Sequence, residues 1–303
     1  MYLPHLEILD PRFTGLVLAN THLETLWSGG RWLEGPAWFG GGRYLVFSDI
    51  PNDRMLRYDD ADGSVSEFRR PANNANGNTR DGQGRLVTCE HLGRRVTRTE
   101  HDGRITVLSD SWRGKRLNSP NDVVVAADGA VWFTDPTYGI DSDYEGARAE
   151  SEIGASHLYR IDPATGATEA MATDFVQPNG LAFSPDGGTL YVADTGATHL
   201  TGGPRHIRRF AVTADRLSGG EVLSVCDAGL YDGFRIDRAG RIWTSAGDGV
   251  HCLTPEGVLL GKIRVPEVVA NVCFGGRRHN RLFICATTSL YATYLDTAGT
   301  PCP

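Results

Sequence analysis

The chain has 303 residues, 40% of them hydrophobic, and a formal net charge of −7 at pH 7. This charge argues against a nucleic-acid surface, because phosphate binding requires clustered Lys and Arg side chains. Paired arginines such as Arg94–Arg95, Arg208–Arg209 and Arg277–Arg278 are spread along the chain and are typical of solvated strand edges. No apolar stretch is long enough to span a bilayer, and the start, MYLPHLEILD, lacks the features of a signal peptide. We therefore expect a cytoplasmic protein that binds neither nucleic acid nor membrane.

One repeat recurs along the chain, in which an Asn, Asp or Glu stands just ahead of a short apolar strand and a turn. The six residues that open its copies are Glu34, Asn76, Asn121, Asn179, Asp232 and Asn271. Their spacings of 42, 45, 58, 53 and 39 residues match the length of a four-stranded propeller blade. The sequence therefore predicts an all-β, six-bladed β-propeller of four-stranded blades, which fills residues 1–303 as one domain with almost no helix.

The last copy of the repeat is one outer strand short. After LFICA only SLYATYLD remains before the Pro-containing tail, whereas earlier copies continue into two more strands. The segment THLETLWSGGRWLE near the N-terminus aligns with the outer strands that lead into other copies. We expect residues near His22 to Trp27 to complete the sixth blade, because this closes the ring and removes two exposed sheet edges.

Two connections, residues 137–156 and 195–206, are longer than the others. Enlarged loops on a rigid scaffold commonly carry recognition. Tyr138 and Tyr144 belong to the first loop, and aromatic faces pack well against sugar rings. This loop can act as a lid or contact a neighbouring subunit, so both a monomer and a homodimer are compatible with the sequence.

The cysteines indicate neither a disulfide framework nor a zinc site. The chain has six of them, without any CxxC pair, spread from Cys89 to Cys302. Cys89, Cys273 and Cys285 fall in expected inner strands. We expect all six to be reduced thiols that pack as small apolar residues.

The repeat residues should meet at one end of a central channel, because each precedes a strand by the same spacing. Glu34, Asn121, Asn179 and Asp232 then bring two carboxylates and two amides to one place. An oxygen-only ligand set suits a hard divalent cation such as calcium or magnesium better than zinc. A cation also relieves the repulsion between two neighbouring carboxylates.

Other polar residues have a structural and a functional explanation. Asp49 and Asp135 end strands in the sequences FSD and FTD, where an Asp commonly caps a turn through its own backbone. His91, His199 and His206 fall in expected loops and can reach a substrate, although a solvent-facing or core His is the commoner case.

Several stretches together resemble the gluconolactonase / senescence marker protein (regucalcin) family, namely EGPAW, SPNDVVVAADGAVWFTDPTYG, QPNGLAFSPDG, YDGFRID and NVCFGG. The resemblance runs from about Glu34 to Ala286, and RLNSPNDVV, DPTYG and DYEGARAESEIG point to the bacterial gluconolactonase-like branch. It implies a metal held by Glu34, Asn179 and Asp232, with calcium favoured and magnesium, manganese or zinc as alternatives. It also implies a catalytic or substrate-side role for Asn121.

One position departs from the family pattern. The mammalian members carry an Arg two residues before the axial Asn, where this chain has Ser119. Arg116 or Asn118 can take the place of that Arg as a substrate contact, and Tyr138 is a further candidate. The sugar specificity of the mammalian members is therefore not transferred to this chain.

The resemblance implies hydrolysis of a sugar lactone such as glucono-1,5-lactone, with the metal polarising the carbonyl for attack by water. Either Asp232 or a metal-bound water delivers the attack, because a carboxylate that binds a cation is a weak base. The chain has no GxSxG elbow and no recognisable catalytic-cysteine signature. The alternatives are a metal-dependent organophosphate or other ester hydrolase on the same propeller, and a non-enzymatic binding propeller.

Overall fold

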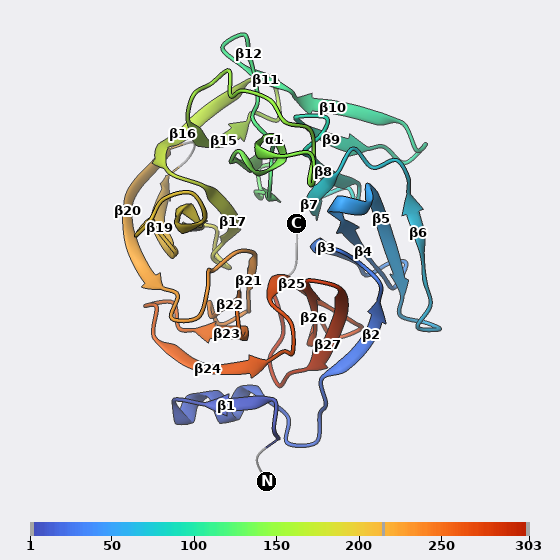
Figure 1. Cartoon of the computed structure of the whole chain (residues 1–303). Helices are drawn as coiled ribbons and strands as arrows, with labels where there is room; N and C mark the ends of the chain where they lie inside the picture. Colours follow the sequence, from blue (N-terminus) through green and yellow to red (C-terminus); the bar gives the residue numbers. More distant parts are fainter. Residues whose placement is uncertain (1–2, 214–215, 301–303) are drawn as a thin grey trace.

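Six antiparallel sheets form a closed ring around a central axis (Figure 1). The computed structural model describes residues 3–213 and 216–300. Within these ranges the helical segments are short: α1 (Tyr138–Asp141) and the 3-10 turns η1 (Pro11–Leu16), η2 (Ile50–Asn52) and η3 (Gly196–Thr198). The predicted six-bladed propeller with almost no helix is confirmed.

Each blade is a meander whose first strand lies nearest the axis and whose last strand lies on the outside. Blades 1 and 2 comprise β3 (Leu33–Phe39), β4 (Tyr44–Asp49), β5 (Arg54–Asp59) and β6 (Val65–Arg69), then β7 (Ala75–Arg80), β8 (Leu86–Glu90), β9 (Arg95–Thr99) and β10 (Ile105–Ser109). A small hairpin of β11 (Ser111–Trp112) and β12 (Lys115–Arg116) follows. Blades 3 and 4 comprise β13 (Val123–Val125), β14 (Val131–Asp135), β15 (Ser156–Ile161) and β16 (Thr168–Phe175), then β17 (Pro178–Phe183), β18 (Thr189–Asp194), β19 (His206–Thr213) and β20 (Arg216–Val225).

The last two blades both recruit a strand from the N-terminal part of the chain. Blade 5 comprises β21 (Phe234–Ile236), β22 (Ile242–Ala246), β23 (Gly249–Leu253) and β24 (Leu259–Arg264), with β1 (Leu6–Ile8) added outside β24. Blade 6 comprises β25 (Val269–Gly275), β26 (Arg281–Ala286), β27 (Ser289–Tyr294) and β2 (Glu24–Ser28). The pairing of β2 with β27, with Thr25 opposite Tyr291, confirms the predicted closure of the ring. The addition of β1 was not predicted.

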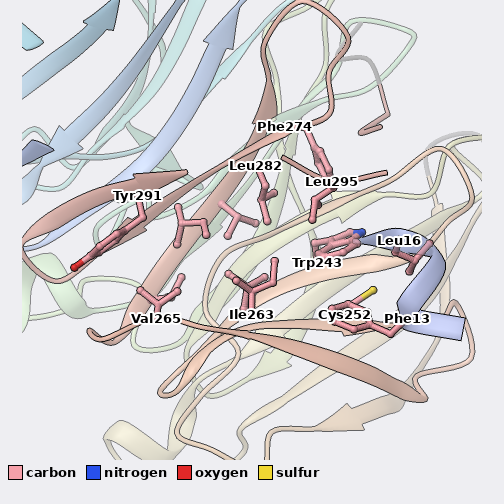
Figure 2. Packing of buried hydrophobic residues seen from close by; sticks show 14 of the residues in the cluster. Phe13, Leu16, Trp243, Cys252, Ile263, Val265, Phe274, Leu282, Tyr291 and Leu295 are labelled. Atoms are coloured by element: carbon pink, nitrogen blue, oxygen red, sulfur yellow. The ribbon is translucent and has the colours of Figure 1, made fainter. Parts of the chain in front are cut away.

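The hydrophobic core of the described residues is divided into six clusters, one between each pair of neighbouring blades. The largest lies between blades 5 and 6 and includes Trp243, Phe274 and Leu282 (Figure 2). Turn η1 joins this cluster through Phe13, which is fully buried with its ring 6.0 Å from that of Trp243. The N-terminal segment therefore contributes apolar packing as well as a strand, and burial of apolar area is the main stabilising term.

The innermost strands bulge where the repeat residues stand. In blade 4 the register shifts between Pro178 and Leu181, so that two residues, Asn179 and Gly180, oppose one residue of β18. A Cβ on Gly180 would lie 2.1 Å from the carbonyl oxygen of Asp232, so only glycine permits this approach of neighbouring blades. Bulges re-aim side chains, and similar shifts occur in blades 1, 2 and 6. They place the repeat residues at the axis.

Among residues 3–213 and 216–300, no helix has the length and apolar character needed to cross a membrane. Five cysteines fall within these ranges and are buried free thiols: Cys89, Cys226, Cys252, Cys273 and Cys285. Cys302, the sixth, lies outside the described residues.

The closure of the ring predicts unequal effects of two N-terminal deletions. Removal of residues 1–30 deletes η1 and β2 and leaves β27 as an unpaired edge, so we expect loss of cooperative unfolding and aggregation. Removal of residues 1–9 deletes only the added strand β1, so we expect a melting temperature lower by about 5 °C with the transition retained. Calorimetry of both variants tests this, and a cooperative transition without residues 1–30 would contradict it.

Candidate active site

A cavity of about 290 Å³ lies on the propeller axis, and five of the six repeat residues line it: Glu34, Asn76, Asn121, Asn179 and Asp232. The sixth, Asn271, touches this group from the side, since its Nδ2 donates to Glu34 Oε2 at 2.9 Å and its Oδ1 accepts from the Val272 N–H. The repeat therefore brings together the four residues that the sequence indicated for catalysis and metal binding.

Two carboxyl groups at this site, Glu34 and Asp232, interact electrostatically. Glu34 is only 3% exposed, and its Oε2 also accepts from the N–H of Gly35. Burial, followed by the charge of Asp122, raises the pKa of Glu34 to about 8. Burial and then the charge of Glu34 raise the pKa of Asp232 well above its usual range. Two such acids resist ionising together, and a bound cation would remove that penalty.

The amide residues are held by hydrogen bonds within their own blades and, for Asn121, also by a backbone contact with blade 2. The Asn121 N–H donates to the carbonyl oxygen of Thr134 at 2.8 Å, and the Asn121 carbonyl accepts from the Gly77 N–H at 2.7 Å. The Nδ2 of Asn179 donates to Thr195 Oγ1 at 3.3 Å, which directs its Oδ1 away from that hydroxyl. These hydrogen bonds consequently fix the positions of Asn121 and Asn179 at the cavity wall.

The chemistry of this donor set fits a hard divalent cation. Glu34 and Asp232 supply carboxylate oxygens and Asn179 an amide oxygen, without nitrogen or sulfur ligands. Within the described ranges of the chain, no three His, Cys, Asp or Glu side chains gather to hold a metal. An ion held by these two carboxylates would take amide oxygens or water as its remaining ligands, which is common for calcium.

Buried aspartates support the repeat residues from behind. Asp135 Oδ2 and Oδ1 accept from the N–H groups of Asn118 and Ser119, at 2.9 and 2.8 Å, just before Asn121. Asp49 accepts from the Arg31 N–H, three residues before Glu34, at 3.0 Å. Asp194 plays the equivalent part in blade 4, where it accepts from the N–H groups of Val176 and Gln177, just before Asn179. These contacts support a structural role for Asp49 and Asp135, in which each carboxylate accepts from the backbone of the segment that enters its blade rather than from the backbone of its own turn.

The cavity has an apolar and a polar wall. Trp32, Leu230, Val268 and Val269 form the apolar wall, from the segments that enter blades 1, 5 and 6. The polar wall comes from the two enlarged loops and consists of Tyr138, Glu145, Thr195 and Thr198. A ligand with one hydrophobic face and one polar face, such as a sugar ring, suits this division.

The two enlarged loops are tied to each other beside the cavity. The hydroxyl of Tyr138, in α1, lies 2.7 Å from Thr195 Oγ1 and 2.9 Å from Thr198 Oγ1. Asp141 Oδ2 lies 2.8 Å from Nε2 of His199. In Figure 1, α1 projects from blade 3 toward the centre of the ring. Tyr144 is 52% exposed and does not line the cavity, whereas its neighbour Glu145 does.

Arg116 and Asn118 are not among the residues that line the cavity. Arg116 is exposed on β12, and its side chain donates to the carbonyl of Gly93. Asn118 is fully buried, and its amide bonds the carbonyls of Asp135 and Ala155 and the hydroxyl of Ser151. Their substrate contacts stay predictions, and these positions favour structural roles.

Ser119, where the mammalian members carry an Arg, anchors the first enlarged loop. Its hydroxyl donates to the carbonyl of Pro136 at 2.7 Å and accepts from the N–H of Gly139 at 3.0 Å. The start of α1 therefore depends on this side chain. The position that departs from the mammalian pattern is thus used for loop packing.

Of the three histidines, only His91 contacts an axial side chain. It is fully buried, with Nε2 3.2 Å from Asn76 Nδ2. His199 instead joins the enlarged loops, and His206, at the start of β19, is outside the cavity lining. Burial lowers the pKa of His91 to about 4, which keeps its ring neutral at physiological pH.

Sequence reasoning missed the apolar wall and Glu145. Trp32, Leu230 and Val269 each stand two residues before a repeat residue. Their shared position in the repeat could therefore have predicted that they line the cavity. The corresponding Gln177 in blade 4 is covered by the first enlarged loop, since its amide bonds Thr137. Glu145 lies inside that loop, whose path no repeat predicts.

Comparison with known proteins places this architecture in a family of lactone-acting propellers. The family profile described as SMP-30/Gluconolactonase/LRE-like region matches residues 32–288. The chain is 30% identical to a gluconolactonase of Zymomonas mobilis subsp. mobilis, over 96% of this chain and 86% of that protein. It is 28% identical to the pentonolactonase XacC of Haloferax volcanii, over 83% of this chain and 80% of that protein.

A solved structure agrees in fold over nearly the whole length. A gluconolactonase from Xanthomonas campestris superposes with a TM-score of 0.89 at 38% identity, covering 96% of this chain and 94% of that chain. The chain therefore belongs to the SMP-30/gluconolactonase/LRE-like family. The family resemblance read from the motifs is confirmed.

The raised pKa values predict how the metal-free protein responds to pH. Glu34, with a pKa of about 8, and Asp135 and Glu145, with values of about 7, all exceed the ordinary carboxyl value. The folded state therefore holds more protons than the unfolded state, and stability is lost as pH rises through these values. The window from pH 7.0 to 8.5 avoids most histidine titration.

We expect the melting temperature of the chelator-treated protein to fall by about 5 °C between pH 7.0 and 8.5. Glu34→Gln should reduce this fall, because it removes a carboxyl group whose pKa of about 8 lies within the window. Differential scanning fluorimetry at the two pH values measures both proteins. A melting temperature that rises over this window would contradict the assignment.

Proposed function

We propose that this protein is a divalent-metal-dependent hydrolase that opens a sugar lactone such as glucono-1,5-lactone to the aldonic acid. The enzyme class, lactone hydrolase, agrees with the gluconolactonase and pentonolactonase relatives. The observation that carries the proposal is the convergence of Glu34, Asn179 and Asp232 on one cavity of the propeller axis. Calcium is the favoured ion, because every candidate ligand atom is an oxygen.

The carboxylates of Glu34 and Asp232 and the amide oxygen of Asn179 would hold the ion. A divalent cation bound there supplies positive charge against the oxyanion that develops when water attacks the lactone carbonyl. Water adds its oxygen to the carbonyl carbon, the bond from that carbon to the ring oxygen breaks, and the ring oxygen leaves as a hydroxyl group. One proton is released as the aldonic acid ionises.

The other lining residues would orient the lactone. Asn121 can donate its amide N–H to a lactone oxygen from the polar side of the cavity. Asp232 can accept a hydrogen bond from the attacking water, although a carboxylate that also binds a cation is only a weak base. The apolar wall, with Trp32 at its edge, would pack against the C–H face of the ring. Orientation of this kind can lower the barrier by several kcal/mol.

Substitution of the two carboxylates tests the proposal. Glu34→Gln and Asp232→Asn retain shape and remove one charge each, so we expect lactone opening to fall by about 100-fold or more while the fold is kept. A pH-indicator assay with glucono-1,5-lactone measures the rate, and added calcium should restore chelator-treated wild type but neither variant. Asp62→Asn, in an exposed turn, is the matched control and should leave the rate unchanged.

The outcomes separate the alternatives. Wild-type rates in both variants would remove Glu34 and Asp232 from the mechanism. A wild-type protein that opens no lactone with any of calcium, magnesium, manganese or zinc, but hydrolyses a phosphotriester or another ester, would favour the hydrolase of different substrate class. Inactivity toward all of these would favour a binding propeller.

A further inference from the structure

Asn76, the repeat residue of blade 2, has an unused oxygen at the cavity. The residue is only 3% exposed and lines the cavity next to Glu34. Its Oδ1 exposes less than 1 Å² and has no hydrogen-bond partner within the described part of the chain. A buried acceptor without a partner carries a desolvation penalty of its own. Such an atom at a cavity wall indicates a missing ligand.

The direction of this oxygen follows from a chain of hydrogen bonds through His91. The backbone carbonyl of Glu145 lies 3.1 Å from His91 Nδ1 and can only accept, so Nδ1 carries the proton. A neutral imidazole then has an unprotonated Nε2, which accepts from Asn76 Nδ2 at 3.2 Å. Because the amide nitrogen is engaged by His91, the amide oxygen of Asn76 must point the other way.

The imidazole is fixed in this position by packing. His91 is fully buried, and a Cβ on Gly139 of α1 would lie 2.5 Å from the His91 Cβ. Only a glycine allows the helix to approach so closely. The first enlarged loop therefore holds His91 from two sides, through Gly139 and through the carbonyl of Glu145.

The backbone of Asn76 is equally fixed beside the first carboxylate. Its carbonyl oxygen accepts from Ser48 Oγ at 2.7 Å and would lie 2.0 Å from a Cβ on Gly35, the residue after Glu34. Asn78 Nδ2 bridges this carbonyl to the carbonyl of Gly35, at 3.0 and 2.9 Å. Asn76, in β7, and Glu34, in β3, thus present oxygen side chains from neighbouring innermost strands.

A small cation is a better partner for this oxygen than a hydroxyl group. A hydrogen-bonded oxygen approaches to about 2.7–3.0 Å, and a water-sized probe barely reaches Oδ1. A calcium ion approaches to about 2.3–2.6 Å and takes six to eight oxygen ligands. Two of the side chains that converge here, Glu34 and Asp232, are also acceptors when ionised, so a cation would meet the requirement of all three groups.

We propose that Asn76 Oδ1 is a further oxygen ligand of the axial cation and that His91 is the positioning residue that aims it. The inference rests on the proposed function, because it concerns the same metal site. It adds a fourth blade to the three that supply Glu34, Asn179 and Asp232. A larger ligand number favours calcium over the smaller magnesium ion.

The test is calorimetric titration of the chelator-treated full chain with calcium chloride, which does not depend on lactonase activity. We expect Asn76→Ala to raise the Kd for calcium by about 10- to 100-fold, and His91→Phe to raise it by about 10-fold. Asn76→Asp keeps an oxygen in place and should bind calcium at least as tightly as wild type. Asn280→Ala, which removes an amide bonded to the Leu295 carbonyl in a distant turn, is the matched control and should keep the wild-type Kd.

Thermal unfolding in chelator separates a ligand from a structural residue. Because Asn76→Ala removes an unsatisfied acceptor but also the donor to His91 Nε2, the two effects oppose each other, and the metal-free variant should melt within about 3 °C of wild type. A Kd within twofold of wild type for Asn76→Ala would overturn the inference and leave the proposed function standing. A wild-type protein that binds no divalent ion would overturn both, whereas calcium-dependent lactone opening together with an unchanged Kd would overturn this inference alone.

Discussion

The close approach of six innermost strands at one axis is the constraint on which the rest of this structure depends. Neighbouring blades pack so tightly there that a Cβ on Gly180 would meet the carbonyl oxygen of Asp232 at 2.1 Å. Bulges turn the repeat residues inward, and the six clusters between the blades hold this geometry from outside. The propeller thereby holds oxygen-bearing side chains close together. The repulsion between their carboxylates favours the binding of a cation at this site.

Charges outside the cavity lining modulate this repulsion. Asp122 follows Asn121, is nearly fully buried, and forms an ion pair with Arg235 at 3.5 Å. The charge of Asp122 raises the pKa of both Glu34 and Asp232, while Arg235 lowers that of Glu34. The partly buried Arg235 thus opposes two of these three carboxylates, Asp122 and Glu34. A divalent ion at the axis would bring the local charge close to balance.

The sequence predicted the ring well because its information is periodic. Blade length, the repeat residues and the missing outer strand follow from a comparison of the copies of the repeat, and the structure confirms the fold and the closure by β2. The contributions of the loops do not repeat. Glu145 reaches the cavity only through the folded path of residues 137–156, and His91, placed by its sequence in an ordinary loop, is buried beneath α1. Long-range packing decides such positions, so no local pattern indicates them.

The central claim, that the axial oxygens hold a divalent cation, is tested most directly by anomalous X-ray scattering from crystals of the protein grown with manganese. We predict one strong anomalous peak on the propeller axis, within about 2.0–2.6 Å of oxygens of Glu34, Asn179 and Asp232. A peak elsewhere, or no peak at an occupancy-saturating manganese concentration, would contradict the account.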